Sequence, residues 1–246
     1  MNSLEIIVET LEDAQAAEEG GATQLDLKAH YPCSGITPSI GMVTVVSRAV
    51  KIPIMMMIRP HARSFQASSG DLQAAAKDIQ IARENGIHNF MVGFLTKEHR
   101  LDVKALEYLR KVAGDAHLHM HLAWELCSDP WEALEELLTL GFHSLHTGGL
   151  TTQGKAFGGS ALEATANIRH ISAIIAGRME IFLAGSVNAT NAAELIRSTG
   201  ITNLHCGRGV RTPQSAEGQV DPVKVSLVRQ AQLAAIDQLP SINLHV

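Results

Sequence analysis

The stretch His117-Leu118-His119-Met120-His121 alternates an imidazole with an apolar side chain at every second position. Because successive side chains of a β-strand point to opposite faces, the three histidines share one face and the apolar residues share the other. The pattern therefore predicts a strand that packs one face against the protein core. Its other face carries groups that can do chemistry.

The chain on both sides of this stretch alternates between short apolar runs and helical patterns. Strands are predicted at residues 4–8, 24–28, 54–58, 89–93, 117–121, 144–147, 180–184 and 203–206. Helices are predicted at residues 10–20, 37–50, 71–84, 101–112, 130–140, 161–175, 191–198 and 221–235. Thr10 with Asp13 predicts a capping box for the first helix, and Thr37 before Pro38 predicts the cap of the second.

Glycines at the predicted helix ends fit this alternation, since a helix commonly ends through a left-handed residue. They precede the even-numbered strands at Gly21, Gly86, Gly141 and Gly200. Eight strand and helix units specify a parallel sheet and close into a (β/α)8 TIM barrel. A doubly wound open sheet is the alternative, but no G-x-G-x-x-G follows the first strand. We expect a single domain over residues 1–246, with 236–246 as a tail or docking segment.

Composition limits the functional classes. The formal charge of -5, with Lys and Arg scattered, gives no electrostatic footprint for nucleic acid. No apolar run approaches membrane-spanning length, and the start of the chain lacks a leader pattern. The three cysteines, Cys33, Cys127 and Cys206, form no C-x-x-C pair, which suits a reducing compartment. We therefore expect a cytoplasmic protein that binds neither nucleic acid nor membrane.

Polar residues on barrel strands are expected to face the barrel axis, because the other strand face packs against helices. Functional groups of this fold lie at the C-terminal ends of the strands. This criterion ranks six residues above His117 and Glu5 as site candidates: Asp26, Lys28, Arg59, His121, His146 and His205.

Imidazoles and carboxylates together suit a divalent transition metal or acid-base chemistry near neutral pH. The candidate metal ligands are His121, His146, His205 and Asp26. For catalysis, His121 or Glu125 would act as acid or base, and Lys28 or Arg59 would hold an anion. A lone inward histidine is more often a hydrogen-bonded core residue, but so many charged groups in one barrel mouth indicate function.

Three methionines, Met55 to Met57, could offer thioethers to Cu(I), although a buried parallel strand is the favoured interpretation.

Two loops near the C-terminal end of the chain have a sequence typical of anion binding. Gly185 and Ser186 follow the seventh strand, and Gly207 and Arg208 follow the eighth, where this fold often binds phosphate. They predict a site for phosphate or another small anion, unless the glycines serve only the turns.

Several motifs together resemble the CutC family of copper homeostasis proteins. Leu4-Glu5 matches the Leu-Glu of the family's first strand. The most specific match is to the family's Gly-Leu-Thr-Pro-Ser loop. The matching stretches are Gly35-Ile36-Thr37-Pro38-Ser39, Ile58-Arg59-Pro60, Gly93-Phe94-Leu95 and Met120-His121-Leu122-Ala123-Trp124-Glu125. The resemblance covers nearly the whole barrel.

The chain departs from the family pattern at informative positions. The family's Glu-Leu-Cys is Asp26-Leu27-Lys28 here, cysteines common after the first Leu-Glu are Ile7 and Val8, and the arginine after the fifth-strand histidine is Leu122. The resemblance implies a cytoplasmic, homo-oligomeric (β/α)8 barrel associated with copper and with Cu(I) binding attributed to cysteines. Those cysteines are missing from the matching positions, so Zn or another divalent metal is an alternative to copper.

Three functions remain open from the sequence. The first is a metal-binding homeostasis protein that holds copper at the C-terminal mouth of the barrel. The second is a barrel enzyme (a lyase, isomerase or hydrolase) acting on a small substrate that can carry phosphate, with His121 as acid or base. The third is a non-catalytic oligomeric scaffold.

Overall fold

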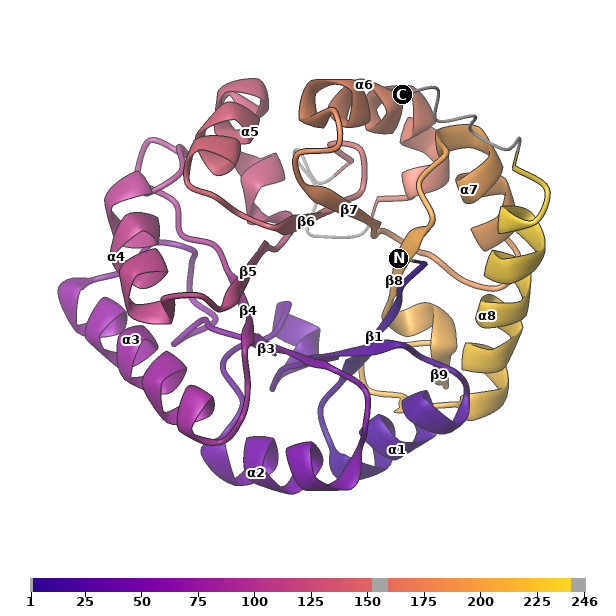
Figure 1. Cartoon of the computed structure of the whole chain (residues 1–246), viewed down its shortest axis with the longest axis horizontal. Coiled ribbons are helices and arrows are strands. Elements are labelled where there is room, and N and C mark those ends of the chain that lie inside the picture. The colour runs from indigo at the N-terminus through magenta and orange to yellow at the C-terminus, as the bar shows by residue number, and fades with distance from the viewer. Residues whose placement is uncertain (1, 152–158, 240–246) are drawn as a thin grey trace.

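The computed structural model describes residues 2–151 and 159–239, and its strands form a closed barrel surrounded by helices (Figure 1). The barrel strands follow one another in chain order as β1 (Leu4–Val8), β2 (Gln24–Leu27), β3 (Ile54–Met57), β4 (Asn89–Val92), β5 (His117–Met120), β6 (Ser144–Thr147), β7 (Glu180–Leu183) and β8 (Asn203–Cys206). Neighbouring strands are parallel, and β1 pairs with β8 to close the ring. The predicted (β/α)8 barrel is confirmed, and the open-sheet alternative is wrong.

The helices form the outer layer (Figure 1). They are α1 (Leu11–Glu19), α2 (Ile40–Ala49), α3 (Ser69–Glu84), α4 (Val103–Ala113), α5 (Pro130–Thr139), α6 (Thr165–Ile175), α7 (Ala192–Thr199) and α8 (Pro222–Ile236). Short 3-10 helices lie in the loops between strands and helices. They are η1 (Tyr31–Cys33), η2 (Leu122–Leu126), η3 (Ala161–Ala164) and η4 (Arg208–Val210). Of the predicted tail, residues 240–246 lie outside the described residues. None of the described helices is long and apolar enough to cross a membrane.

The main apolar core lies between the strands and the helices. On β1, Leu4, Ile6 and Val8 belong to this core and are fully buried, whereas Glu5 and Ile7 face the barrel interior. A second apolar cluster inside the barrel comprises Met55, Met57 and Met91. The barrel interior is therefore filled partly by methionine side chains and partly by polar side chains. Most barrels of this fold are instead filled by branched aliphatic side chains.

Helix starts were only partly predicted. Thr10 caps α1 by accepting a hydrogen bond from the Asp13 N–H, but the capping box predicted there is wrong. The Asp13 carboxylate instead accepts the N–H groups of Glu9 and Val220. Ser39, not Thr37, caps α2, because the Thr37 hydroxyl accepts the N–H of Arg59. These side chains serve tertiary contacts that local patterns do not reveal.

The glycines at the helix ends were predicted correctly. Gly21, Gly86, Gly141 and Gly200 all have positive φ, between 70° and 92°. An L-residue there would be strained, so these turns depend on glycine.

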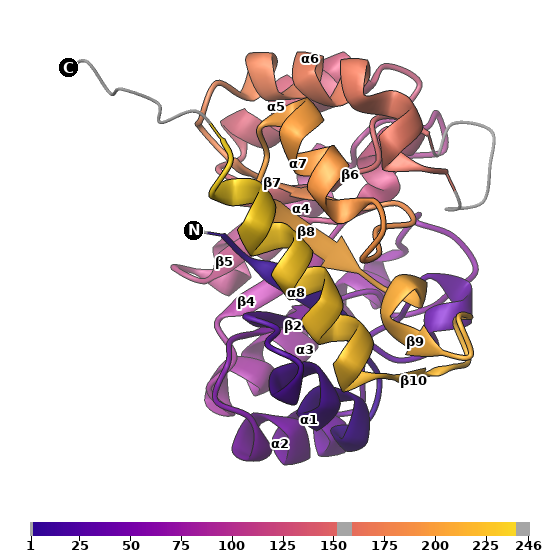
Figure 2. The ribbon, with the colours of Figure 1, turned by 90° about the vertical axis from the view of Figure 1, so that its right-hand side faces the viewer.

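A two-stranded hairpin at the C-terminal end of the barrel was not predicted. It pairs β9 (Arg211–Thr212) with β10 (Gln219–Val220) and lies beside η4 (Figure 2). The buried Arg211 guanidinium donates to the carbonyl of Ile7 and lies 3.2 Å from the Asp13 carboxylate. These contacts fix the hairpin to β1 and α1. Strands of two residues are too short to give a periodic signal.

Candidate functional site at the barrel mouth

Glu5 on β1 lies at the centre of a buried polar cluster. Its Oε1 is 2.6 Å from Nε2 of His146 on β6 and 2.8 Å from Nδ1 of His205 on β8. Its Oε2 accepts a hydrogen bond of 2.6 Å from the Gln24 amide on β2. Both carboxylate oxygens are therefore satisfied, as a fully buried Glu requires.

The histidines determine the ionisation of Glu5. Burial acts to raise the pKa of this carboxyl, but His146 and His205 outweigh it and hold the pKa well below the usual value. Burial and the neighbouring His205 lower the pKa of His146 to about 3. The pair is thus an ionised carboxylate that accepts an N–H from a neutral imidazole, which leaves His146 protonated at Nε2.

Asp26 and Lys28 form an ion pair beside this cluster. Lys28 Nζ is 2.6 Å from Asp26 Oδ2, and His205 Nε2 is 3.9 Å from the same oxygen. Burial raises the pKa of Asp26, although the charges of Lys28 and His205 oppose that shift. His205 therefore lies between two carboxylates, one on each side of its ring.

His117 and His119 share one face of β5, as predicted, but they lie deeper in the barrel. His117 Nε2 is 2.6 Å and His119 Nδ1 is 2.7 Å from the hydroxyl of Ser144. The ring of His119 also packs edge-on against His146, with centroids 4.1 Å apart. These two histidines support the cluster from below and do not line its open side.

His121 follows β5 and caps η2. Its Nδ1 accepts a hydrogen bond of 3.1 Å from the Ala123 N–H. Burial, with the nearby charges of Arg59 and Lys28, lowers the pKa of His121 well below its usual value. A neutral ring that accepts at Nδ1 carries its proton at Nε2. His121 is therefore arranged as a hydrogen-bond donor, since its lone pair is already used.

Two predicted site residues are engaged in holding loops. The Arg59 guanidinium donates to the carbonyls of Cys33, Gly35 and Ala62. Glu125 accepts the Thr147 hydroxyl and the Gly148 N–H, each at 2.7 Å. Neither side chain lines the cavity described next.

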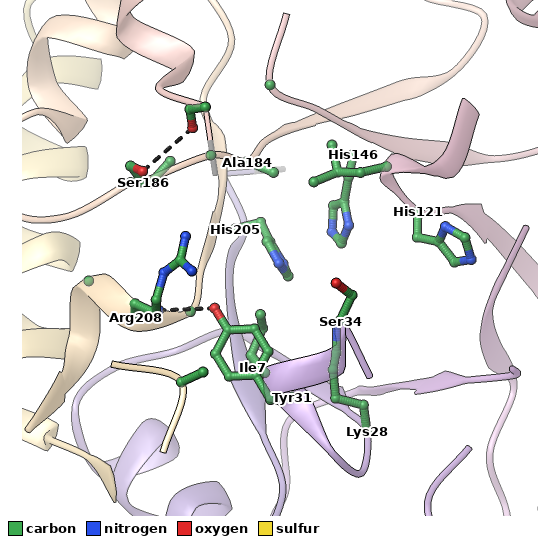
Figure 3. A pocket seen from close by; sticks show the side chains of 18 of the residues that line it. Ile7, Lys28, Tyr31, Ser34, His121, His146, Ala184, Ser186, His205 and Arg208 are labelled. Carbon is green, nitrogen blue, oxygen red and sulfur yellow. Dashed lines mark hydrogen bonds between the residues drawn. The ribbon is translucent and has the colours of Figure 1, made fainter. Parts of the chain in front are cut away.

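A cavity of about 210 Å³ lies above the cluster (Figure 3). Of the predicted residues it brings together Lys28, His121, His146, His205, Gly185, Ser186, Gly207 and Arg208. No aspartate or glutamate is among the described residues that line it. Asp26 lies beneath the lining, where it pairs with Lys28.

Glu5 was ranked below the six predicted site residues, and Tyr31 was not predicted. Glu5 is the second residue of β1, yet the closing register makes it the Cα partner of His205, the third residue of β8. Strand tilt and shear in a barrel offset the strands in this way, so position along a strand does not fix depth. Tyr31, just after β2, accepts a hydrogen bond from the Arg208 N–H at its hydroxyl. A polar aromatic residue after a barrel strand was the available signal.

The model of the CutC family matches residues 2–210. The chain belongs to the CutC family. A CutC family protein from Porphyromonas gingivalis is 36% identical over 202 residues, which cover 82% of this chain and 79% of that protein. The human copper homeostasis protein cutC homolog is 31% identical over 203 residues, covering 82% of this chain and 72% of the human protein. The resemblance drawn from the sequence motifs is confirmed.

The CutC crystal structure from Streptococcus agalactiae has the same fold. It superposes with a TM-score of 0.77 at 25% sequence identity, and the match covers 84% of this chain and 98% of that one. The fold of this chain is therefore the fold of a solved CutC structure, as its family membership predicts.

Proposed function

We propose that this CutC-family chain acts in the cytoplasm in copper homeostasis and binds a copper ion through Glu5, His146 and His205. The observation that carries the proposal is their geometry: one oxygen and two nitrogens, all buried, lie within 4.8 Å of one another. The name of the human relative, copper homeostasis protein cutC homolog, supports copper as the cargo.

The donor set suits Cu(II), with Zn(II) as the alternative, because imidazole and carboxylate are ligands of borderline and hard ions. Metal binding would displace the protons that His146 Nε2 and His205 Nδ1 share with Glu5. Three protein ligands would leave the cavity side open for water or a small ligand.

The structure also guides the choice among the predicted ligands. His146 and His205 remain in the proposed set. Glu5 takes the place of Asp26, whose Oδ2 is already paired with Lys28, and of His121, whose Nδ1 accepts a backbone N–H. A thiolate site for Cu(I) gains no support, since Cys206 packs in the core between strands and helices and none of the cysteines lines the cavity.

A barrel enzyme is the second candidate function, and one observation favours it. The cavity presents Lys28, Arg208 and three histidines, with no carboxylate among its described lining residues. In such an enzyme a neutral His121 would act as a hydrogen-bond donor, rather than transfer a proton as expected from the sequence.

Metal titration of the purified, EDTA-treated chain tests the metal proposal. With a competing chromophoric chelator, the wild type should bind one equivalent of Cu(II) or Zn(II). Glu5→Gln and His146→Gln should each weaken binding by roughly a hundredfold or more. His117→Gln changes a barrel histidine outside the proposed ligand set and should bind as the wild type does. Less than one equivalent bound by the wild type, or unchanged affinity in Glu5→Gln, refutes the proposal.

A further inference from the structure

Three consecutive backbone N–H groups at the rim of the cavity have no acceptor in the part of the chain that the structure describes. Among the described residues, none accepts a hydrogen bond from the N–H of Gly185, Ser186 or Val187. Gly185 and Ser186 both have positive φ, +99° and +57°, so the chain turns away from the sheet directly after β7. All three residues line the cavity. Consecutive backbone N–H groups around a concave surface can bind an anion.

Arg208 lies on the same side of the cavity (Figure 3). Its backbone N–H donates a hydrogen bond of 3.2 Å to the Tyr31 hydroxyl, which holds the backbone of Arg208 in place. No described residue accepts a hydrogen bond from its guanidinium or pairs with its charge. An exposed cation is common, but this one is anchored next to three unpaired N–H groups.

His121 and Lys28 lie on the opposite wall of the cavity (Figure 3). His121 is 6% exposed and lines the cavity, and its Nε2 has no hydrogen-bond partner among the described residues. Because Nδ1 accepts the Ala123 N–H, this Nε2 carries the proton. This nitrogen is buried beside Gly93, so it does not contact a ligand in the cavity. Lys28 lines the cavity, and its Nζ pairs with Asp26.

We infer that the cavity binds a small molecule carrying a phosphate monoester. The phosphate group sits on the N–H groups of Gly185, Ser186 and Val187 and pairs with Arg208. The remainder of the molecule extends across the cavity towards Lys28. A phosphate monoester has three terminal oxygens and close to two negative charges at neutral pH, which matches this set of donors better than a carboxylate does.

This inference rests on the second candidate function, for which it names the ligand class, and uses none of the proposed metal ligands to hold the phosphate. The two proposals can therefore fail separately. Arg208 is the residue to change, because its exposed guanidinium contacts no described partner and its loss should leave the fold intact. Arg48 on α2 is the matched control, since it is also exposed and lies outside the cavity.

The probes are inorganic phosphate and glycerol 3-phosphate, added to the EDTA-treated full-length chain and followed by amide resonances in NMR. Saturable shifts of the Gly185, Ser186 and Val187 amides are expected. Arg208→Gln should weaken binding roughly tenfold or more, while Arg48→Gln should match the wild type. Glycerol, which lacks the phosphate, should not bind.

Three results would overturn the inference: no saturable shift with either probe, equal affinity in wild type and Arg208→Gln, or acetate binding as tightly as phosphate. The same titration on Glu5→Gln separates the two proposals. Phosphate binding that survives in this variant while metal binding is lost supports both. Phosphate binding without any metal binding in the wild type refutes the metal proposal alone.

Discussion

His146 Nε2 lies 2.6 Å from Glu5 Oε1, although 141 residues of chain separate the two residues. Closure of the barrel brings β6 and β1 to opposite sides of a narrow interior and lets their side chains meet on the axis. The contact compensates a fully buried carboxylate that would otherwise cost several kcal/mol. It therefore stabilises the same carboxylate that we propose as a metal ligand.

Glu5→Gln should destabilise the protein by about 2–3 kcal/mol in chemical denaturation. Both oxygens of Glu5 accept hydrogen bonds, from two histidines on one side and from Gln24 on the other. A glutamine can accept on only one side, so its amide nitrogen would face a donor. Glu19→Gln, at an exposed position of α1, should change stability by less than about 0.5 kcal/mol. Equal denaturation midpoints for the two variants would contradict this account of the cluster.

Stability should fall as the pH drops below about 6.5. Burial, with His143 nearby, lowers the pKa of His117 to about 4. Between pH 6.5 and 4 the unfolded chain therefore binds a proton at this position that the folded chain does not, so unfolding is favoured as the pH decreases. Between pH 7.5 and pH 5, protonation at His117 should lower the free energy of unfolding by about 1 kcal/mol. This value is smaller than the pKa shift alone would give, because the ring is partly exposed.

His117→Gln tests this pH effect, because it removes the titrating group and keeps a polar side chain near Ser144. The urea midpoint of the variant should fall less between pH 7.5 and pH 5 than that of the wild type. Parallel pH profiles for the two proteins would show that His117 does not contribute.

Gly93→Ala should displace the ring of His121. A Cβ at Gly93 would lie 2.7 Å from His121 Nε2, closer than van der Waals contact permits. The ring would have to move, which strains or breaks the hydrogen bond from Ala123 and costs about 1–3 kcal/mol. The ¹⁵N chemical shifts of the imidazole should report a changed tautomer balance. Gly41→Ala, where only the Ser39 hydroxyl lies within 4 Å, should leave both stability and His121 unchanged.

Met57→Leu with Met91→Leu should leave binding of Cu(II) or Zn(II) within about threefold of the wild type, because thioethers are poor ligands for these ions. Both residues line the cavity and belong to the methionine cluster inside the barrel. Replacement by leucine nearly conserves volume, so stability should change by less than about 1.5 kcal/mol per site. A large loss of metal affinity in a folded double variant would mean that the thioethers are ligands after all.

The sequence located the elements and faces well because both are local properties. Alternation on β5 predicted the face that His117 and His119 share, and glycines marked the helix ends. The boundaries differ from the prediction where a side chain has a tertiary partner: Thr37 bonds to Arg59, so Ser39 caps α2. The hairpin of β9 and β10 is fixed by Arg211 and Asp13, which are far apart in the chain and carry no shared pattern.

The sequence by itself determined the eightfold alternation, the inward histidines and the family, since these depend on the order and spacing of residues. Only the tertiary structure decided which polar groups meet. The closing register placed Glu5 beside His205, and local geometry at η2 turned His121 into a donor. The physical reason is that hydrogen-bond partners on a barrel axis come from strands far apart in sequence. Their relative heights follow from tilt and shear, which no single strand encodes.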